Sequence, residues 1–289
     1  MPASCHISSD ALRVSINDHG AEICSIKNKA GTEFIWQADK QVWARHAPVL
    51  FPIVGRLKNN QFIFEEKTYD MGQHGFARDQ VFELKESDAT SCTFELRSTA
   101  ASKRTFPFEF IFRISYRLDG NTLITNYTVT NPSQEALLFS VGAHPAFIYP
   151  LSKNEKQEDH YIEFEAEQLE ITELANGLLT DKKQQLKLAN KRLFLSPKIF
   201  ENDALVFENG QIATVTLGSV SSDHKITMRC EGWPYFGIWS KPGQNFVCLE
   251  PWYGIADAEH SNQQLTDKKG IMKLGAGEEF CCEFLLEII

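Results

Sequence analysis

An alternating pattern of apolar and polar side chains in residues 108–118 constrains the fold of this chain more than any other feature. Every even position of Phe108-Glu-Phe-Ile-Phe-Arg-Ile-Ser-Tyr-Arg-Leu118 is apolar and most odd positions are polar. This period of two is typical of a β-strand with one buried face. Asp119-Gly120 follows, a dipeptide favoured in tight hairpin turns, and in residues 121–131 every second side chain from Leu123 to Val129 shares one face. The pattern predicts an antiparallel hairpin.

The same construction recurs along the chain. Two further turn dipeptides separate strand-like runs: Asn209-Gly210 between residues 204–208 and 211–217, and Pro242-Gly243 between residues 236–240 and 245–250. Other strand candidates are residues 12–16, 22–27, 32–36, 61–64, 80–85, 92–98, 161–165, 225–230 and 279–286. Long amphipathic helices are not expected, and residues 41–51, 151–158 and 181–191 are interpreted as loops or short helical turns.

These runs predict an all-β fold, a large antiparallel β-sandwich with few short helices. The length of 289 residues exceeds that of many domains, but all-β sandwiches often reach it as one unit. Because no low-complexity linker or fixed-period repeat divides the chain, we expect residues 1–289 to form a single domain.

Composition excludes several classes of partner. The formal net charge of −9 and the pI near 5.4 disfavour binding to nucleic acids or to anionic membranes. No apolar segment approaches the length of a membrane span, and residues 1–10 do not resemble a signal peptide. Seven scattered cysteines, two of them adjacent, do not suggest a disulfide framework or a structural zinc site. We therefore expect a cytoplasmic protein.

Four short segments differ from ordinary strand sequence because polar side chains stand among small or apolar neighbours. They are Phe51-Pro-Ile-Val-Gly-Arg56, Gln73-His-Gly-Phe-Ala-Arg78, Val141-Gly-Ala-His-Pro-Ala-Phe147 and Leu249-Glu-Pro-Trp-Tyr-Gly254. In the last segment Glu250 follows an apolar run and precedes Pro251, which lacks an N–H group and is expected to end regular pairing. This places a carboxylate at a strand end.

In their order and approximate spacing, these four segments resemble those of aldose 1-epimerases, the galactose-mutarotase-like family. The resemblance extends from about residue 10 to the C-terminus and is closest to the LacX-like branch. It implies a large antiparallel supersandwich, no cofactor, no metal, and a small aldose sugar as the binding partner. A monomer or homodimer is expected.

The resemblance also implies roles for individual residues. His144 matches the general acid of the family and Glu250 its general base. The matching sugar-binding residues are His74, Arg56 and, with looser flanking similarity, Asp203. Arg78 either reaches the sugar or pairs with an acid such as Asp79, and Trp252 or Trp239 is expected to stack on the sugar ring. Gly55-Arg56 stands where galactose mutarotases commonly have Asn-Arg, which leaves the preferred sugar open.

The chemistry explains why these residue types suffice. Mutarotation opens the sugar ring and recloses it on the other face, which requires one base for the anomeric hydroxyl and one acid for the ring oxygen. Unperturbed pKa values near 4.3 for Glu and near 6.5 for His predict an ionised Glu250 facing a protonated His144. The predicted activity is therefore metal-independent interconversion of α and β hexose anomers by acid–base catalysis.

Three alternatives remain open from the sequence. A sugar-binding or sensing protein would use the same cleft without catalysis. A metal-dependent enzyme would use His74, His144 and Glu250 as ligands. A hexose-6-phosphate mutarotase would need a cationic pocket, for which Arg56, Lys58 and Arg78 are available.

Overall fold

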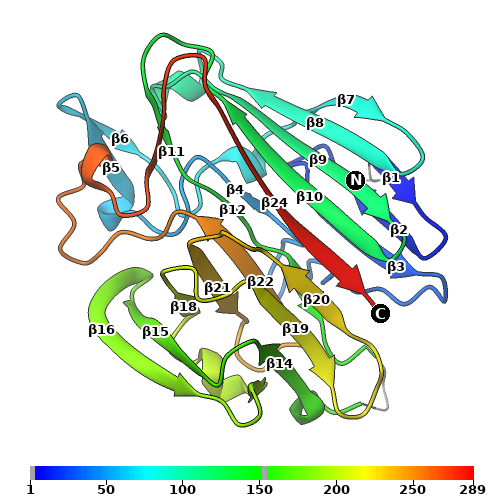
Figure 1. Cartoon of the computed structure of the whole chain (residues 1–289). Coiled ribbons are helices and arrows are strands. Elements are labelled where there is room, and N and C mark those ends of the chain that lie inside the picture. The colour runs from blue at the N-terminus through cyan, green and yellow to red at the C-terminus, as the bar shows by residue number, and fades with distance from the viewer. Residues whose placement is uncertain (1–3, 152–154) are drawn as a thin grey trace.

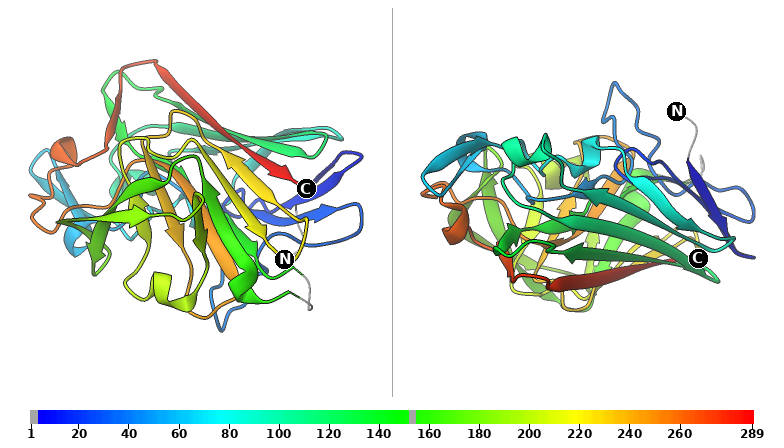
Figure 2. Two further views of the ribbon diagram at one scale, coloured as in Figure 1. Left: turned by 60° about the horizontal axis from the view of Figure 1, so that its bottom comes forward. Right: turned by 90° about the horizontal axis from the view of Figure 1, so that it is seen from above.

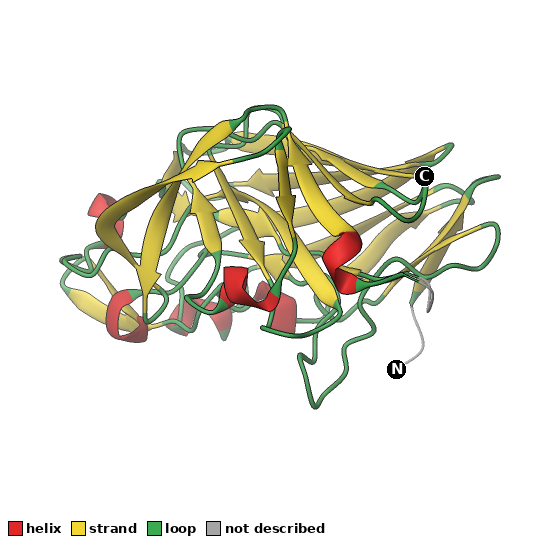
Figure 3. Cartoon of the chain, turned by 90° about the horizontal axis from the view of Figure 1, so that it is seen from below, coloured by secondary structure: helices red, strands yellow, loops and turns green. Residues whose placement is uncertain are grey.

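The structure is a computed structural model that describes residues 4–151 and 155–289. β-strands form most of it, and the helical segments are short (Figure 3). Within the described residues these segments are all 3₁₀ turns: η1 (Lys58–Asn60), η2 (Ala77–Asp79), η3 (Ser102–Arg104), η4 (Gln157–Asp159), η5 (Pro197–Phe200) and η6 (Leu265–Asp267). The predicted all-β class is confirmed.

Two large antiparallel sheets form the framework (Figure 1). The first has nine strands, in the spatial order β17 (Arg192–Phe194), β14 (His160–Phe164), β19 (Thr214–Ser219), β20 (Ile226–Arg229), β24 (Glu279–Ile288), β10 (Thr122–Thr130), β9 (Ile111–Asp119), β8 (Ser91–Arg97) and β7 (Glu83–Ser87). The C-terminal strand β24 lies between β10 and β20, so it joins the first and second halves of the chain within one sheet.

The second large sheet has eight strands, and its strand β22 (Phe246–Tyr253) includes the predicted site residues Glu250 and Trp252. Its main path is β16 (Leu178–Lys187), β15 (Gln168–Ala175), β18 (Leu205–Phe207), β21 (Tyr235–Trp239), β22, β12 (Val141–Ala143) and β4 (Val49–Leu50), and β13 (Ala146–Ile148) also pairs with β22.

Three small sheets complete the fold: β1 (Cys5–Ser8), β2 (Leu12–Ile16) and β3 (Ile23–Asn28); β5 (Gln61–Phe64) and β6 (Lys67–Asp70); β11 (Leu137–Phe139) and β23 (Met272–Leu274). The β5–β6 hairpin lies at the end of the molecule opposite the C-terminus, and η6 lies beside it (Figure 2).

The apolar core lies between the sheets, and β22 shows how one strand serves two faces. Val247 and Leu249 pack into the main core cluster, whereas Glu250 and Trp252 face a cavity on the other side of the sheet. Because successive side chains of a strand point to opposite faces, the core contacts of the odd positions orient the even ones toward the cavity.

The hairpin predicted from the alternating pattern is confirmed, with its turn displaced by one residue. β9 pairs with β10, and the side chains from Leu123 to Val129 that were expected to share a face are buried. Thr122 pairs with Asp119, so Gly120 and Asn121 form the two-residue loop instead of Asp119-Gly120. Gly120 has a φ of +58° and thus supplies the left-handed conformation of this turn.

The hairpin predicted at Asn209-Gly210 is wrong. Both residues have positive φ as a tight turn requires, but β18 belongs to the eight-stranded sheet and β19 to the nine-stranded sheet. The chain therefore crosses from one sheet to the other at this turn. The Pro242-Gly243 prediction is confirmed, because β21 and β22 pair directly, with Trp239 opposite Cys248.

Other predicted boundaries were partly wrong. Residues 181–191 were interpreted as a loop, but they lie largely in β16, which pairs with β15 at the sheet edge. Most side chains of β16 are exposed, so its sequence shows no alternation of apolar and polar residues. Residues 32–36 form only isolated bridges, and residues 80–82 precede β7. The predicted loop at residues 151–158 includes residues 152–154, which lie outside the described residues. All seven cysteines are free.

Candidate active site

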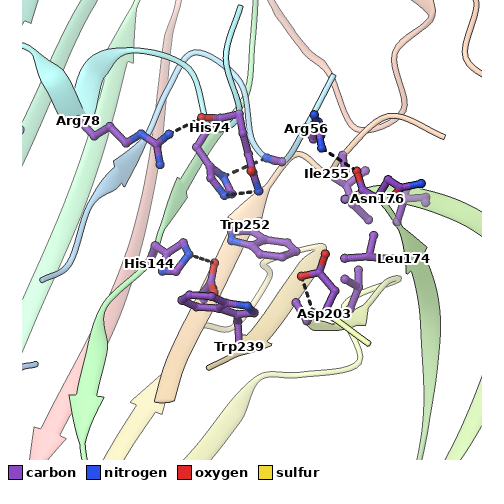
Figure 4. Close-up of a pocket in the computed structure, with 18 of the residues that line it drawn as sticks. Arg56, His74, Arg78, His144, Leu174, Asn176, Asp203, Trp239, Trp252 and Ile255 are labelled. Carbon is purple, nitrogen blue, oxygen red and sulfur yellow. Dashed lines mark hydrogen bonds and ion pairs between the residues drawn. The ribbon is translucent and has the colours of Figure 1, made fainter. Parts of the chain in front are cut away.

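A cavity of about 410 Å³ opens on the face of the eight-stranded sheet turned away from the core (Figure 4). This volume lies within the usual range of small-molecule sites. The cavity brings together all seven residues predicted to form the site, which come from segments far apart in the sequence: Arg56, His74, Arg78, His144, Asp203, Glu250 and Trp252.

A break in strand pairing places His144 opposite Glu250. β12 pairs with β22 at Trp252 and Tyr253, and β13 pairs with β22 at residues 246–248. His144 and Pro145 lie between β12 and β13, where neither strand pairs with Glu250. The prediction that Pro251 ends regular pairing is wrong, because β22 continues through Pro251 to Tyr253 and the interruption falls in its neighbour.

His144 and Glu250 form a buried couple. His144 Nε2 lies 3.2 Å from Glu250 Oε2, and both side chains are less than one-tenth exposed. Burial lowers the pKa of His144 to about 3 and raises the pKa of Glu250 well above its usual range. The expected ion pair is therefore disfavoured: loss of solvation penalises both charges, so burial favours two neutral groups with one proton between them.

His74 is held in one tautomer by the neighbouring backbone. The N–H of Gly55 donates to His74 Nδ1 over 3.1 Å, and the N–H of His74 donates to the carbonyl of Gly55 over 2.9 Å. Since Nδ1 accepts a hydrogen bond, the neutral ring carries its proton on Nε2. Gln73 Nε2 lies 3.2 Å from His74 Nε2, and two N–H donors cannot bond each other, so the Gln73 amide must be turned to present its oxygen to a protonated Nε2. A ligand oxygen that replaces this amide oxygen would accept the same hydrogen bond.

The buried state of His74 predicts a pH-dependent stability. Burial, followed by the charges of nearby cationic groups, lowers the pKa of His74 well below 6.5. The unfolded state therefore binds a proton that the folded state does not, and stability falls as pH decreases below about 6.5. Between pH 6.5 and pH 5 we expect a loss of about 1–2 kcal/mol from this residue.

Urea unfolding at pH 7 and pH 5 checks this expectation. His144 contributes in the same direction, so the informative comparison is between the wild type and His74→Gln, which cannot titrate. The variant should lose less stability than the wild type over this interval. Equal losses in the two proteins would contradict a neutral, buried His74.

Arg56 and Arg78 line the cavity from opposite sides of His74 (Figure 4). Arg56 Nη1 donates to the carbonyl of Asn176 over 3.0 Å, and Arg78 Nη2 donates to the carbonyl of Gln73 over 2.6 Å. Burial lowers the pKa of Arg78 to about 10. Arg78 Nε lies 3.9 Å from the carboxylate of Asp79, too far for a hydrogen bond. The hydrogen bond to this carboxylate comes from Arg45 Nη2, over 2.9 Å.

Aromatic side chains surround His144 and Glu250. Trp252 packs against Gly237, where an added Cβ would lie only 2.2 Å from the indole ring. Trp239 also lines the cavity, so both tryptophans proposed to stack on a sugar are present. Trp43 stacks on His144 with ring centroids 5.2 Å apart and an interplanar angle of 26°.

Three polar or aromatic lining residues were missed by the sequence interpretation: Trp43, Gln73 and Asn176. Trp43 lies between Val42 and Ala44 in a segment that was interpreted as a loop, where a large aromatic side chain was a usable signal. Asn176 has a φ of +53° in the turn between β15 and β16, and no sequence feature connects that turn to the site.

One group of side chains in the site matches the donor types of a metal centre. Ligand atoms of His144, Cys248 and Glu250 lie within 4.8 Å of one another. Imidazole, thiolate and carboxylate are donors that Zn²⁺ accepts. This set differs from the one considered in the sequence analysis, because it contains Cys248 in place of His74.

The fold and the site together define a large antiparallel β-sandwich with an acid–base couple in its cavity. The sequence profile of the aldose 1-epimerase family matches residues 4–271. The plasmid-encoded protein LacX of Lactococcus lactis subsp. lactis is 33% identical over 279 residues, which cover 93% of each chain. The chain therefore belongs to the aldose 1-epimerase family, a family of isomerases, and is similar to LacX within it.

Two solved structures extend this comparison. A galactose mutarotase related enzyme from Lactobacillus acidophilus is 37% identical, with a TM-score of 0.94 over 99% of this chain and 97% of its own. A galactose mutarotase-like protein from Lactobacillus casei is 30% identical, with a TM-score of 0.90 over 99% of both chains. Among the described residues, no helix is long and apolar enough to span a membrane.

Proposed function

We propose that the protein is a mutarotase that interconverts the α and β anomers of a hexose, with His144 as general acid and Glu250 as general base. The observation that carries this proposal is the buried contact of 3.2 Å between His144 Nε2 and Glu250 Oε2 inside a sugar-sized cavity. A buried carboxyl and imidazole that share a proton form a natural proton-transfer couple.

The reaction needs no change in the total number of protons in the site. When a sugar enters between the two groups, transfer of their shared proton to His144 leaves Glu250 as a carboxylate. Glu250 then removes the proton from the anomeric hydroxyl while His144 protonates the ring oxygen, so the C1–O5 bond breaks as the C1=O1 bond forms. Rotation about C1–C2 and the reverse proton transfers close the ring on the other face.

The other lining residues position the sugar in this proposal. The Nε2–H of His74 and the guanidinium groups of Arg56 and Arg78 are hydrogen-bond donors for sugar oxygens, and Asp203 is an acceptor for ring hydroxyls. Trp252, or Trp239 opposite it, provides an aromatic face for the apolar side of the ring. Donors and acceptors on several sides of the cavity match a polyhydroxylated ligand.

A hexose 6-phosphate is the second candidate substrate, because two guanidinium groups line the cavity. The third cation considered for this role does not support it. Lys58 donates through Nζ to the carbonyl of Ser261 over 3.0 Å and is not part of the cavity lining.

Anomer exchange measured by NMR tests the proposal. Purified protein, dialysed against a chelator, is added to glucose, galactose and glucose 6-phosphate, and the exchange rate of each sugar is compared with the uncatalysed rate. Acceleration that survives chelation supports the acid–base mechanism. Loss of activity on chelation, with recovery on adding Zn²⁺, would favour a metal centre, and sugar binding without exchange would favour a non-catalytic binding protein.

A further inference from the structure

A buried ion pair lies beside one wall of the candidate active site. Lys268 Nζ is 3.1 Å from Asp257 Oδ1, and both side chains are less than one-twentieth exposed. Neither residue lines the cavity, but Ile255 and Ala256, which immediately precede Asp257, do. Because both charges lose their hydration, such a pair contributes little net stability, and its effect on the structure lies in the contacts that it fixes.

Asp257 connects three segments of this wall that are remote in sequence. Its N–H donates to the carbonyl of Arg56 over 2.9 Å, and its own carbonyl accepts from the N–H of Leu179 over 2.8 Å. Its Oδ2 accepts from the N–H of Lys58 over 3.0 Å. Arg56, Leu179 and residues 255–256 all line the cavity, so a single residue outside the lining holds this wall together.

Lys268 fixes the direction in which the Asp257 carboxylate points. Its ammonium group donates to Asp257 Oδ1 over 3.1 Å and to the carbonyl of Ile255 over 2.5 Å. Hydrogen bonds between charged groups are stronger than those between neutral groups, so Oδ1 is held at the lysine and Oδ2 is left for the N–H of Lys58. Without the ammonium group, the buried carboxylate loses its counter-ion and its fixed direction.

The position of Arg56 depends on these contacts. Its backbone carbonyl is bonded to Asp257, and its guanidinium donates to the carbonyl of Asn176, in the turn that leads into β16, over 3.0 Å (Figure 4). The backbones approach closely here, because a Cβ added at Gly55 would lie only 2.5 Å from the backbone nitrogen of Ala256. Both ends of Arg56 are therefore tied to segments that Asp257 connects.

We infer that Asp257 and Lys268 are a positioning pair for the sugar, which fixes the wall of the cavity that carries Arg56. This inference rests on the proposed mutarotase function. Neither residue touches the sugar, and both act through Arg56. His144 and Glu250 are held by the pairing of β12, β13 and β22 and by their own contact, so loss of the pair weakens sugar binding and leaves the proton transfers nearly unchanged.

Anomer-exchange kinetics of Lys268→Met test the pair. Met keeps most of the length of the side chain and removes the charge. We expect KM to rise about 5- to 10-fold, the size of one lost hydrogen bond to the sugar, and kcat to change less than about 2-fold. A fall in kcat with an unchanged KM would overturn the inference.

Lys269→Met is the matched control. Lys269 is the next residue and pairs with the buried carboxylate of Glu208, but neither Lys269 nor Glu208 lines the cavity. This substitution also removes a lysine from a buried carboxylate, and it should change KM and kcat less than about 2-fold, because two exchanged hydrogen bonds at a remote site do not move Arg56. Equal rises in KM for the two lysine variants would overturn the inference.

A double-variant comparison shows whether the pair acts through Arg56. In a protein that already carries Arg56→Ala, Lys268→Met should raise KM less than about 2-fold further, because residues in one chain of contacts have non-additive effects. A further rise as large as that in the wild type would overturn positioning through Arg56. If Lys268→Met does not fold, Asp257→Asn combined with Lys268→Met replaces it with the same expectations, since that protein buries no unpaired charge.

Hydrogen exchange provides a measurement that does not depend on catalysis. The N–H groups of Lys58 and Leu179 both donate to Asp257. In Lys268→Met, peptides that contain these amides should exchange about 10-fold faster than in the wild type, while peptides from β9 and β10 keep the wild-type rate. Unchanged exchange at both amides would overturn the role of the pair even in an active mutarotase. Faster exchange in a protein that accelerates no sugar would support the fixed wall and contradict only the proposed function.

Discussion

Replacing Glu250 by Gln is expected to lower kcat for anomer exchange by about 10²–10⁴-fold, the usual contribution of a positioned acid or base. Gln keeps the size of the side chain and cannot remove the proton from the anomeric hydroxyl. Because the wild-type carboxyl is buried with a raised pKa, its neutral replacement should leave thermal stability unchanged or increase it. The NMR exchange rate and the unfolding midpoint are measured on the same samples.

The companion variant and the control make this result specific. His144→Asn should lose a similar factor, and the double variant should lose little more than either single one, since the two residues act as a unit. Glu259→Gln is the matched control: it makes the same substitution a short distance after Glu250 in the sequence, at a carboxylate that is exposed to solvent. A Glu250→Gln protein that retains more than about one-tenth of the wild-type rate would contradict the assignment of Glu250 as base.

Replacing Gly75 by Ala is expected to destabilise the protein by about 3–5 kcal/mol. Gly75 has a φ of +69°, and a Cβ added there would lie 2.3 Å from the carbonyl oxygen of Phe51. That oxygen accepts hydrogen bonds from the N–H groups of Phe76 and Ala77, so it cannot move without breaking them. The free energy of unfolding in urea measures this loss of stability. The strained backbone should also displace His74, the preceding residue, and so weaken sugar binding.

Gly120→Ala is the control that separates backbone strain from steric overlap. Gly120 has a φ of +58°, similar to that of Gly75, but an added Cβ would meet no atom within 4 Å. Its replacement should cost about 1–2 kcal/mol, the cost of left-handed backbone alone. Equal destabilisation by the two substitutions would show that the contact between Gly75 and Phe51 does not constrain the site.

Local sequence patterns predicted the strands well where one face of a strand is buried. Residues 12–16 and 61–64 were predicted with the boundaries that the structure has, and the alternating run 108–118 forms β9 from Ile111 onward. β16 was missed because it lies at a sheet edge and exposes most of its side chains, so burial imposes no period on its sequence.

Local sequence patterns did not predict which distant segments pair with each other. Asn209-Gly210 has the dihedral angles of a hairpin turn, yet the flanking strands belong to different sheets. A dipeptide determines how sharply the chain turns, whereas the partner of each strand depends on how all the apolar faces are buried together. A hollow lined by residues of β15, β16 and residues 199–205 could not be predicted for the same reason, because these segments meet only in the folded chain.

The sequence by itself determined the all-β class, most strands and, through its resemblance to the aldose 1-epimerases, which residues to expect in the candidate site. Only the tertiary structure decided how those residues lie relative to one another. The gap between β12 and β13 sets His144 against Glu250, and burial of both groups favours a neutral couple over the expected ion pair. Protonation in a site depends on solvation and on distances between segments remote in sequence, and these exist only once the sheets have packed.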